Sequence, residues 1–156
     1  GAEFGDAKKW PEEHFVTVAA DFIARGHNVW IFGSPADLET GETIRVGVEA
    51  LSGIKSRCIN LAGKTTLLDA VDLLSLCTKV ITNDSGLMHI AAAVGCEVLA
   101  IFGSTSPDFT PPLSQRAKII RLDLPCSPCF KRVCPLNHKD CLKTLEPDLV
   151  LANTYE

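Results

Sequence analysis

The chain has 156 residues, of which 46% are hydrophobic and 22% are charged. It contains 15 Lys and Arg residues and 19 Asp and Glu residues, which gives a net charge of −4. A chain of this size and apolar content can bury an ordinary core, which excludes the disordered and collagen-like classes. The acidic balance argues against a nucleic-acid partner, no apolar run is long enough to cross a bilayer, and the opening residues do not predict a signal peptide.

The first half of the chain predicts helices and buried strands in alternation. Residues 11–25 place apolar side chains on one face at helical spacing, and Gly26 suits the helix end. Residues 28–32 form a short apolar run closed by a Gly-Ser-Pro turn, which is typical of a buried strand. A weaker helix over 37–51 and a short strand over 57–61 follow.

The second half repeats this alternation of helix and strand. The expected elements are a helix over 66–75, a strand over 79–82, a helix over 85–94, strands over 97–102 and 118–122, and a terminal helix over 146–154. The strand runs are apolar throughout, as a sheet covered on both faces requires. The sequence therefore predicts an α/β fold, a Rossmann-like parallel sheet with helices on both faces, in a single domain over residues 1–156.

The polar residues that follow the expected strands predict where a ligand binds. In a parallel sheet the ligand crevice lies beyond the carboxyl ends of the strands. After the strand over 79–82 the sequence reads Asn-Asp-Ser-Gly-Leu-Met-His and continues as a helix. Asp84 or Ser85 can cap that helix, Gly86 lets a ligand approach its first amides, and His89 follows one turn later. An anion site and a purely structural cap with a surface histidine both fit this pattern.

Other loops give weaker or negative signals. Lys8 and Lys9 precede the first helix and suit phosphate binding, although two loop lysines also suit plain solvation. The Gly-Lys-Thr of residues 63–65 lacks the first glycine of a P-loop, because Cys58 stands at that position. Neither a dinucleotide-binding G-x-G-x-x-G nor a hydrolase G-x-S-x-G occurs.

The cysteines fall into two groups. Three lie in apolar stretches and suit a core, namely Cys58, Cys77 and Cys96. Four gather in a Cys-rich segment over residues 126–141, namely Cys126, Cys129, Cys134 and Cys141. Their spacing does not match the common zinc or iron–sulfur patterns, so we expect plain thiols or disulfides with a structural zinc ion as the alternative. An odd number of cysteines without an export signal favours a reducing, cytoplasmic setting.

We expect the Cys-rich segment to serve structure and to lie away from the ligand-binding loops, because it follows the last predicted strand. Lys131, Arg132 and Lys139 give it a basic character that suits an anionic molecule or a membrane surface.

Several motifs in this order resemble one known family. They are G-A-E-F-G-D-A-K-K-W-P, F-G-S-P, N-L-A-G-K-T-T-L, N-D-S-G-L-M-H-I-A-A-A, F-G-S-T-S-P-D-F-T-P-P-L and C-S-P-C-F-K-R-x-C-P-x-x-H-x-x-C-L. The chain is similar, from residue 1 to about residue 150, to the C-terminal half of bacterial lipopolysaccharide heptosyltransferases. The resemblance implies a GT-B architecture, in which two Rossmann-like domains face each other and the second binds the nucleotide sugar.

The resemblance also implies an activity and a donor site. The family transfers L-glycero-D-manno-heptose from ADP-heptose to the lipopolysaccharide inner core, with inversion and without a catalytic metal or other cofactor. Lys8 matches the lysine that contacts the diphosphate, Asp84 matches the aspartate that binds the heptose, and Thr65 lies where the family contacts adenosine. The diphosphate-binding helix start corresponds to Ser85, Gly86 and His89. An acidic residue that holds the nucleoside corresponds loosely to Asp37 or Glu39.

The same resemblance places the catalytic base and the acceptor site in an N-terminal half outside these residues. We therefore expect no catalytic residue in this chain, a donor-binding part that is inactive alone, and a complete enzyme at the cytoplasmic face of the inner membrane. Two alternatives stay open: another GT-B nucleotide-sugar enzyme, such as an epimerase or a different transferase, and a non-catalytic module that binds a metal or a partner through its cysteines.

Overall fold

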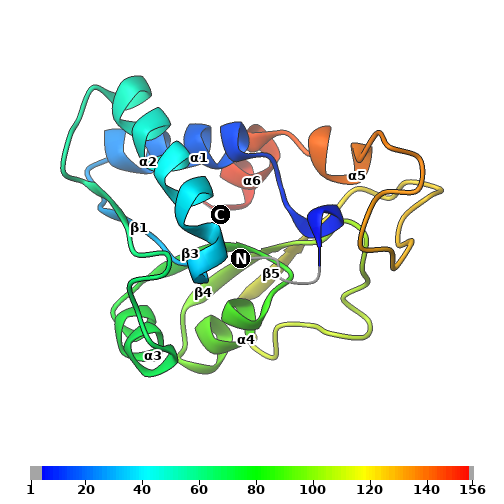
Figure 1. Ribbon diagram of the computed structural model, residues 1–156. Helices are drawn as coiled ribbons and strands as arrows, with labels where there is room; N and C mark the ends of the chain where they lie inside the picture. Colours follow the sequence, from blue (N-terminus) through cyan, green and yellow to red (C-terminus); the bar gives the residue numbers. More distant parts are fainter. Residues whose placement is uncertain (1–4, 155–156) are drawn as a thin grey trace. The chain divides into compact units, whose positions relative to one another are not determined.

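The computed structural model describes residues 5–154, which form two compact units (Figure 1). Among the described residues, unit 1 comprises residues 5–10 and 71–154, and unit 2 comprises residues 11–70. The loop expected at residues 1–5 falls almost wholly outside the described residues. The expectation of a single domain stays a prediction, and each unit is described by itself.

Unit 2 is a pair of helices packed on a two-stranded parallel sheet. Its elements are α1 (Glu12–Ala24), β1 (Val29–Ile31), the 3-10 helix η2 (Pro35–Asp37), α2 (Leu38–Ser52) and β2 (Cys58–Asn60). Strands β1 and β2 pair in register from Val29 with Cys58 to Ile31 with Asn60. Buried apolar side chains of α1, α2 and β2 form the core of this unit, namely Ile23, Ile44, Val48 and Cys58.

A buried amide joins β2 to the start of α2. The Asn60 side chain donates from Nδ2 to the Leu38 carbonyl oxygen at 3.1 Å and accepts at Oδ1 from the Ala62 amide at 3.0 Å. Gly41 of α2 lies directly against this amide, and a Cβ at that position would stand 2.4 Å from Asn60 Oδ1. Glycine at this point of the helix therefore follows from the close approach of Asn60.

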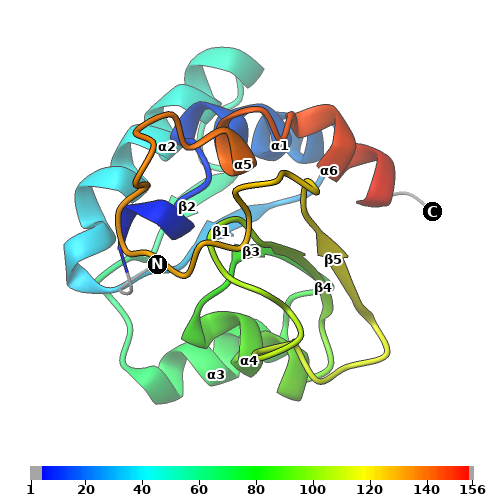
Figure 2. The same cartoon turned by 90° about the vertical axis from the view of Figure 1, so that its right-hand side faces the viewer.

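Unit 1 is built on a three-stranded parallel sheet in the order β3-β4-β5. Its elements are η1 (Asp6–Lys8), most of α3 (Leu67–Ser75), β3 (Lys79–Asn83), α4 (Gly86–Ala93), β4 (Glu97–Ile101), β5 (Ala117–Ile120), α5 (Asp140–Lys143) and α6 (Pro147–Thr154). Helix α4 covers one face of this sheet and α6 the other (Figure 2). Residues 98–102 are therefore almost fully buried, which explains the unbroken apolar run at β4.

The parallel α/β pattern predicted from the sequence is confirmed, with most element boundaries shifted by only one or two residues. Three short helical segments were missed, namely η1, η2 and α5. Each has three or four residues, which is too short for the periodicity of apolar side chains to reveal a helix. Among the residues that the structure describes, no helix is both long and apolar enough to span a membrane.

The contact between Gly41 and Asn60 gives a stability prediction. Gly41→Ala should lower the free energy of unfolding of this chain by about 1–3 kcal/mol, because the added methyl must displace a hydrogen-bonded buried amide. The higher helix propensity of alanine, worth about 1 kcal/mol, offsets only part of this cost. Urea denaturation measures the change, and Val46→Ala on the exposed side of α2 should stay within about 0.5 kcal/mol of the parent. A more stable Gly41→Ala variant would contradict the close contact.

Candidate functional site

The candidate site of unit 1 begins where β3 and β4 end. These strands pair up to Asn83 and Ile101, and the Asp84 amide extends the ladder by donating to the Ile101 carbonyl oxygen at 3.2 Å. The next residues enter α4. The Asp84 side chain is only 5% exposed, so its carboxylate is held inside the carboxyl edge of the sheet.

A lysine from the other end of the sequence neutralises this carboxylate. Lys8 Nζ lies 2.5 Å from Asp84 Oδ2, and the Lys8 side chain is 14% exposed. The segment that carries Lys8 is anchored by Trp10, whose amide donates to Asn83 Oδ1 at 3.1 Å and whose indole Nε1 donates to the Leu145 carbonyl oxygen at 2.8 Å. The structure therefore brings the predicted residues Lys8 and Asp84 together, although 76 positions separate them in sequence.

Thr105 is a third member of this cluster, and the sequence did not single it out among the polar residues of its loop. Its hydroxyl donates to Asp84 Oδ2 at 2.7 Å, so that one carboxylate oxygen contacts both the Lys8 ammonium and the Thr105 hydroxyl. Thr105 lies in the polar loop that follows β4. The position of this loop at a strand end was a usable signal, because such loops converge at one edge of a parallel sheet.

The start of α4 leaves its first amides without a side-chain cap. The N-cap residue is Ser85, with φ −151° and ψ 168°, and its side chain makes no capping hydrogen bond. The possibility that Asp84 caps this helix is wrong, because its carboxylate pairs with Lys8 instead. Gly86 begins the helix with no neighbouring atom within 4 Å of an added Cβ, and His89 is exposed one turn later. Such an open helix start suits an anion.

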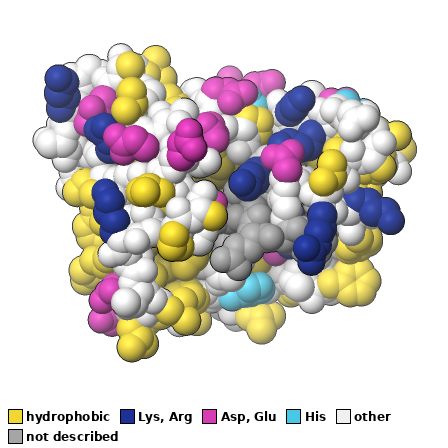
Figure 3. Space-filling view, viewed as in Figure 1, with side chains coloured by type: hydrophobic (Ala, Val, Ile, Leu, Met, Phe, Trp, Pro, Cys, Tyr) yellow, Lys and Arg dark blue, Asp and Glu magenta, His cyan; other side chains and the backbone are white. Residues whose placement is uncertain are grey.

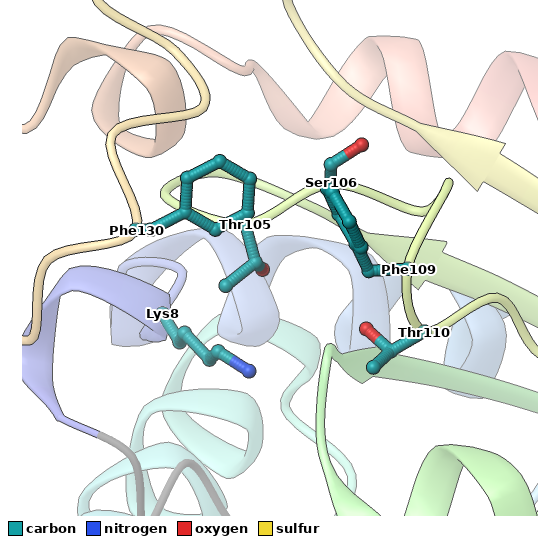
Figure 4. Close-up of a pocket in the computed structure, with 6 residues that line it drawn as sticks. All are labelled: Lys8, Thr105, Ser106, Phe109, Thr110 and Phe130. Carbon is teal, nitrogen blue, oxygen red and sulfur yellow. The ribbon is translucent and has the colours of Figure 1, made fainter.

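A pocket of about 360 Å³ opens beside this cluster (Figure 4). It is lined by Lys8, Thr105, Ser106, Phe109, Thr110 and Phe130. The Lys8 amine points into the pocket, and the rings of Phe109 and Phe130 stand across from it. Unit 1 thus combines a cation, hydroxyl groups and aromatic surface around one hollow, which is the usual composition of a small-molecule site.

The Cys-rich segment lies next to this pocket, and the expectation that it lies away from the ligand-binding loops is wrong. The Phe130 amide donates to the Ser104 carbonyl oxygen at 2.7 Å, and the Ser127 hydroxyl donates to the Gly103 carbonyl oxygen at 2.6 Å. These bonds fold the segment back over the loop that follows β4. Chain order alone did not reveal this return, because it depends on tertiary hydrogen bonds.

The basic character of the Cys-rich segment is visible on the surface. Lys131 and Arg132 are exposed, and Lys139 Nζ lies 3.0 Å from Asp6 Oδ2. Figure 3 shows Lys and Arg side chains interspersed with apolar ones on the right-hand side, where Figure 1 draws this segment in orange. Exposed basic side chains therefore lie on the segment that also carries Phe130 of the pocket.

The cysteines of this segment influence one another. All seven cysteines lie within residues 5–154, and all are free thiols. Burial raises the pKa of Cys141, and so do the neighbouring thiols of Cys129, Cys126 and Cys134. Within the described range, no group of three or more His, Cys, Asp or Glu is arranged to hold a metal ion. The preference for thiols or disulfides over a structural zinc ion stays a prediction.

The remaining predicted residues belong to unit 2. Thr65 lies in the loop after β2, and this loop packs closely on the loop after β1, with the Gly63 amide donating to the Gly33 carbonyl oxygen at 3.0 Å. The Asp37 carboxylate accepts from the Ser34 amide at 2.9 Å and from the Ser34 hydroxyl at 2.8 Å, so it completes a capping box at η2. Glu39 is exposed on α2.

A parallel α/β sheet whose carboxyl edge presents an uncapped helix start and a lysine belongs to the class of Rossmann-like α/β folds. Residues 1–140 match the model of glycosyltransferase family 9 (heptosyltransferase). The chain belongs to this family, as the resemblance in its motifs predicted.

Individual relatives agree with this assignment. The chain is 53% identical over 122 residues to lipooligosaccharide heptosyltransferase 2 of Haemophilus influenzae, a match that covers 78% of this chain and 35% of that protein. It is 39% identical over 153 residues to lipooligosaccharide heptosyltransferase 2 of Campylobacter jejuni, covering 97% of this chain and 47% of that protein. The chain therefore spans less than half the length of these curated relatives.

Solved structures give the same picture. The structure of Escherichia coli ADP-heptose lps heptosyltransferase II matches with a TM-score of 0.83 and 40% identity over 99% of this chain and 43% of that one. A glycosyltransferase of family 9 from Veillonella parvula matches with a TM-score of 0.71 and 27% identity over 94% of this chain and 41% of that one. The neighbours are GT-B heptosyltransferases, so the predicted fold class is confirmed.

The Lys8–Asp84 pair predicts coupled effects on stability. Lys8→Met or Asp84→Asn alone should lower the free energy of unfolding by about 3 kcal/mol, because each leaves a mostly buried polar partner without its counterpart. The double variant should lose less than the sum of the two, with a coupling energy of about 1–3 kcal/mol in a urea-denaturation cycle. The same cycle at Lys139 and the exposed Asp6 should give less than about 1 kcal/mol. Additive losses at Lys8 and Asp84 would contradict the ion pair.

The pKa shifts of two cysteines predict which of them is alkylated faster. Hydrogen bonds from backbone amides, chiefly that of Lys139, lower the pKa of Cys134, whereas burial raises the pKa of Cys58 to about 11. Only the thiolate reacts, so at pH 8 iodoacetamide should modify Cys134 at least about tenfold faster than Cys58. Mass spectrometry of timed samples measures both rates, and unfolding in urea should make them equal. Equal modification rates of Cys134 and Cys58 in the folded chain would contradict the opposite pKa shifts of the two thiols.

Proposed function

We propose that this chain is the donor-binding part of an enzyme that transfers L-glycero-D-manno-heptose from ADP-heptose to the lipopolysaccharide inner core with inversion. The observation that carries the proposal is the placement of Lys8, Asp84 and the uncapped start of α4 at one edge of the sheet. Relatives that are 39% to 53% identical and bear the name heptosyltransferase 2 support this activity.

The leaving diphosphate explains why a cation and open amides lie together. Inverting transfer breaks the bond between the sugar and the diphosphate, so negative charge grows on the departing phosphate oxygens. Lys8 and the first amides of α4 are positioned to stabilise that charge, with the positive end of the helix dipole adding to it. The open space at Gly86 admits phosphate oxygens close to the backbone, and His89 contacts the same anion from the next turn.

Asp84 binds the sugar in this proposal. Its carboxylate is held by Lys8 and Thr105, and a carboxylate with a fixed position can orient sugar hydroxyls by hydrogen bonds. When the diphosphate draws the Lys8 ammonium toward itself, the Thr105 hydroxyl still holds the carboxylate, which becomes available to the sugar. Donor binding therefore exchanges an internal ion pair for two contacts with the ligand.

The nucleoside of the donor contacts unit 2 of this chain, and the acceptor is activated by the N-terminal half of the enzyme. Thr65 contacts the adenosine, with Asp37 or Glu39 as the acidic residue for the nucleoside. The base that activates the acceptor hydroxyl belongs to the N-terminal half of the complete enzyme, so these residues alone bind the donor without transferring it. No metal or other cofactor takes part. The acceptor is anchored in the inner membrane, and the basic side chains of the Cys-rich segment face it from the cytoplasmic side.

Gly86 offers a variant that separates binding from folding. Gly86→Ala should leave the free energy of unfolding unchanged or slightly higher, because no neighbour obstructs the methyl and alanine favours a helix. The methyl should occupy space that the diphosphate needs, so calorimetry on the complete enzyme should show ADP binding weakened by about tenfold or more. Ala93→Ser at the other end of α4 is the matched control and should bind ADP normally.

The transfer assay tests the activity itself. The complete enzyme should transfer heptose from ADP-heptose to the inner core, and Gly86→Ala should reduce that rate in parallel with ADP binding. If Gly86→Ala binds ADP as tightly as the parent enzyme, the diphosphate does not bind at the start of α4. A complete enzyme that accepts other nucleotide sugars but not ADP-heptose would instead favour another transferase or an epimerase.

A further inference from the structure

Two aromatic rings at the rim of the pocket have no role in the donor contacts described above. Phe109 is 76% exposed and Phe130 is 48% exposed. Their ring centroids lie 5.6 Å apart with an interplanar angle of 82°, so each ring limits the movement of the other. A contiguous pair of exposed aromatic side chains that lines a pocket is a common mark of a ligand contact.

The backbone holds Phe130 in this position against its own preference. Its φ is +56°, a region that bulky side chains rarely adopt. The amide of Phe130 donates to the carbonyl oxygen of Ser104 at 2.7 Å, which ties the ring to the loop that carries Thr105. Unusual backbone conformations of this kind persist where surrounding contacts impose them and gather at binding sites.

The pocket changes character from one end to the other. Lys8 and Thr105 line it and also contact the Asp84 carboxylate, so one end is charged and hydrogen-bonding. Phe109 and Phe130 supply apolar surface across from the Lys8 amine (Figure 4). A pyranose ring has the same division, with C–H groups on a face of the ring and hydroxyl groups around its edge.

We propose that this pocket holds the sugar ring of the nucleotide-sugar donor, with an apolar face of the sugar against Phe109 and Phe130. The inference rests on the proposed function and deepens it, because it names the residues that recognise the sugar apart from the diphosphate. The donor sugar is favoured over the acceptor sugar by connectivity. The sugar follows the diphosphate directly, and Lys8, which contacts the diphosphate in the proposed function, lines the same pocket as the two rings.

The test compares ADP with ADP-L-glycero-D-manno-heptose as ligands of the complete enzyme. Calorimetry should show that Phe109→Ala and Phe130→Ala bind ADP within twofold of the parent but bind the ADP-sugar roughly three- to tenfold more weakly. Phe109→Tyr and Phe130→Tyr keep the ring and should restore the affinity. Val133→Ala removes an exposed apolar side chain from the same segment outside the pocket and should bind both ligands normally.

The outcomes separate this inference from the proposed function. If the parent enzyme binds ADP-heptose no better than ADP-glucose, the proposed function fails before any variant is made. If the parent prefers ADP-heptose and both Phe→Ala variants keep that preference, the sugar lies elsewhere and this inference is overturned. A higher acceptor KM with unchanged ADP-heptose affinity would overturn it too, by assigning the rings to the acceptor. Phe109→Leu repeats the test at the more exposed position, where the fold does not depend on the ring.

Discussion

The ion pair between Lys8 and Asp84 organises unit 1 around its candidate site. A carboxylate that is 5% exposed is costly to bury without a cation, and the chain supplies that cation from a segment 76 positions earlier. Trp10 holds this segment against the end of β3 and against the residues before α6. The buried Trp10 therefore fixes the position of the segment that carries Lys8, whereas a lysine on an unsupported surface loop would move freely.

The geometry of parallel strands explains why the pair stands at a binding edge. Every strand of the β3-β4-β5 sheet ends on the same side, so the residues after β3 and the loop after β4 meet there. Asp84 comes from the first of these segments and Thr105 from the second, and α4 begins beside them. A helix start that lacks a side-chain cap adds partial positive charge to the same place. The Lys8 ammonium, the Thr105 hydroxyl and the open amides of α4 together suit a ligand that carries a diphosphate and a polar group attached to it.

The Cys-rich segment contributes to this edge through its backbone and one aromatic ring. Its hydrogen bonds to the carbonyl groups of Gly103 and Ser104 support the loop that carries Thr105. Phe130 thereby reaches the pocket, while the segment's cysteines remain free thiols within the described residues. The segment thus combines a supporting role with a direct contribution to the pocket wall, and it places the exposed Lys131 and Arg132 on the neighbouring surface.

The sequence by itself determined the order and nature of the main elements. Apolar periodicity and glycine stops identified ten helices and strands, because those signals depend on each segment's own burial. It also indicated Asp84, Ser85, Gly86 and His89, since a polar run between a strand and a helix marks a strand end. The family resemblance supplied Lys8, which two loop lysines alone could not distinguish from solvated charges. Only the tertiary structure revealed the partner of Asp84, the contributions of Trp10, Thr105 and Phe130, and the return of the Cys-rich segment to the pocket. These features depend on contacts between residues far apart in sequence, and no local pattern encodes which distant groups a fold brings within hydrogen-bonding distance.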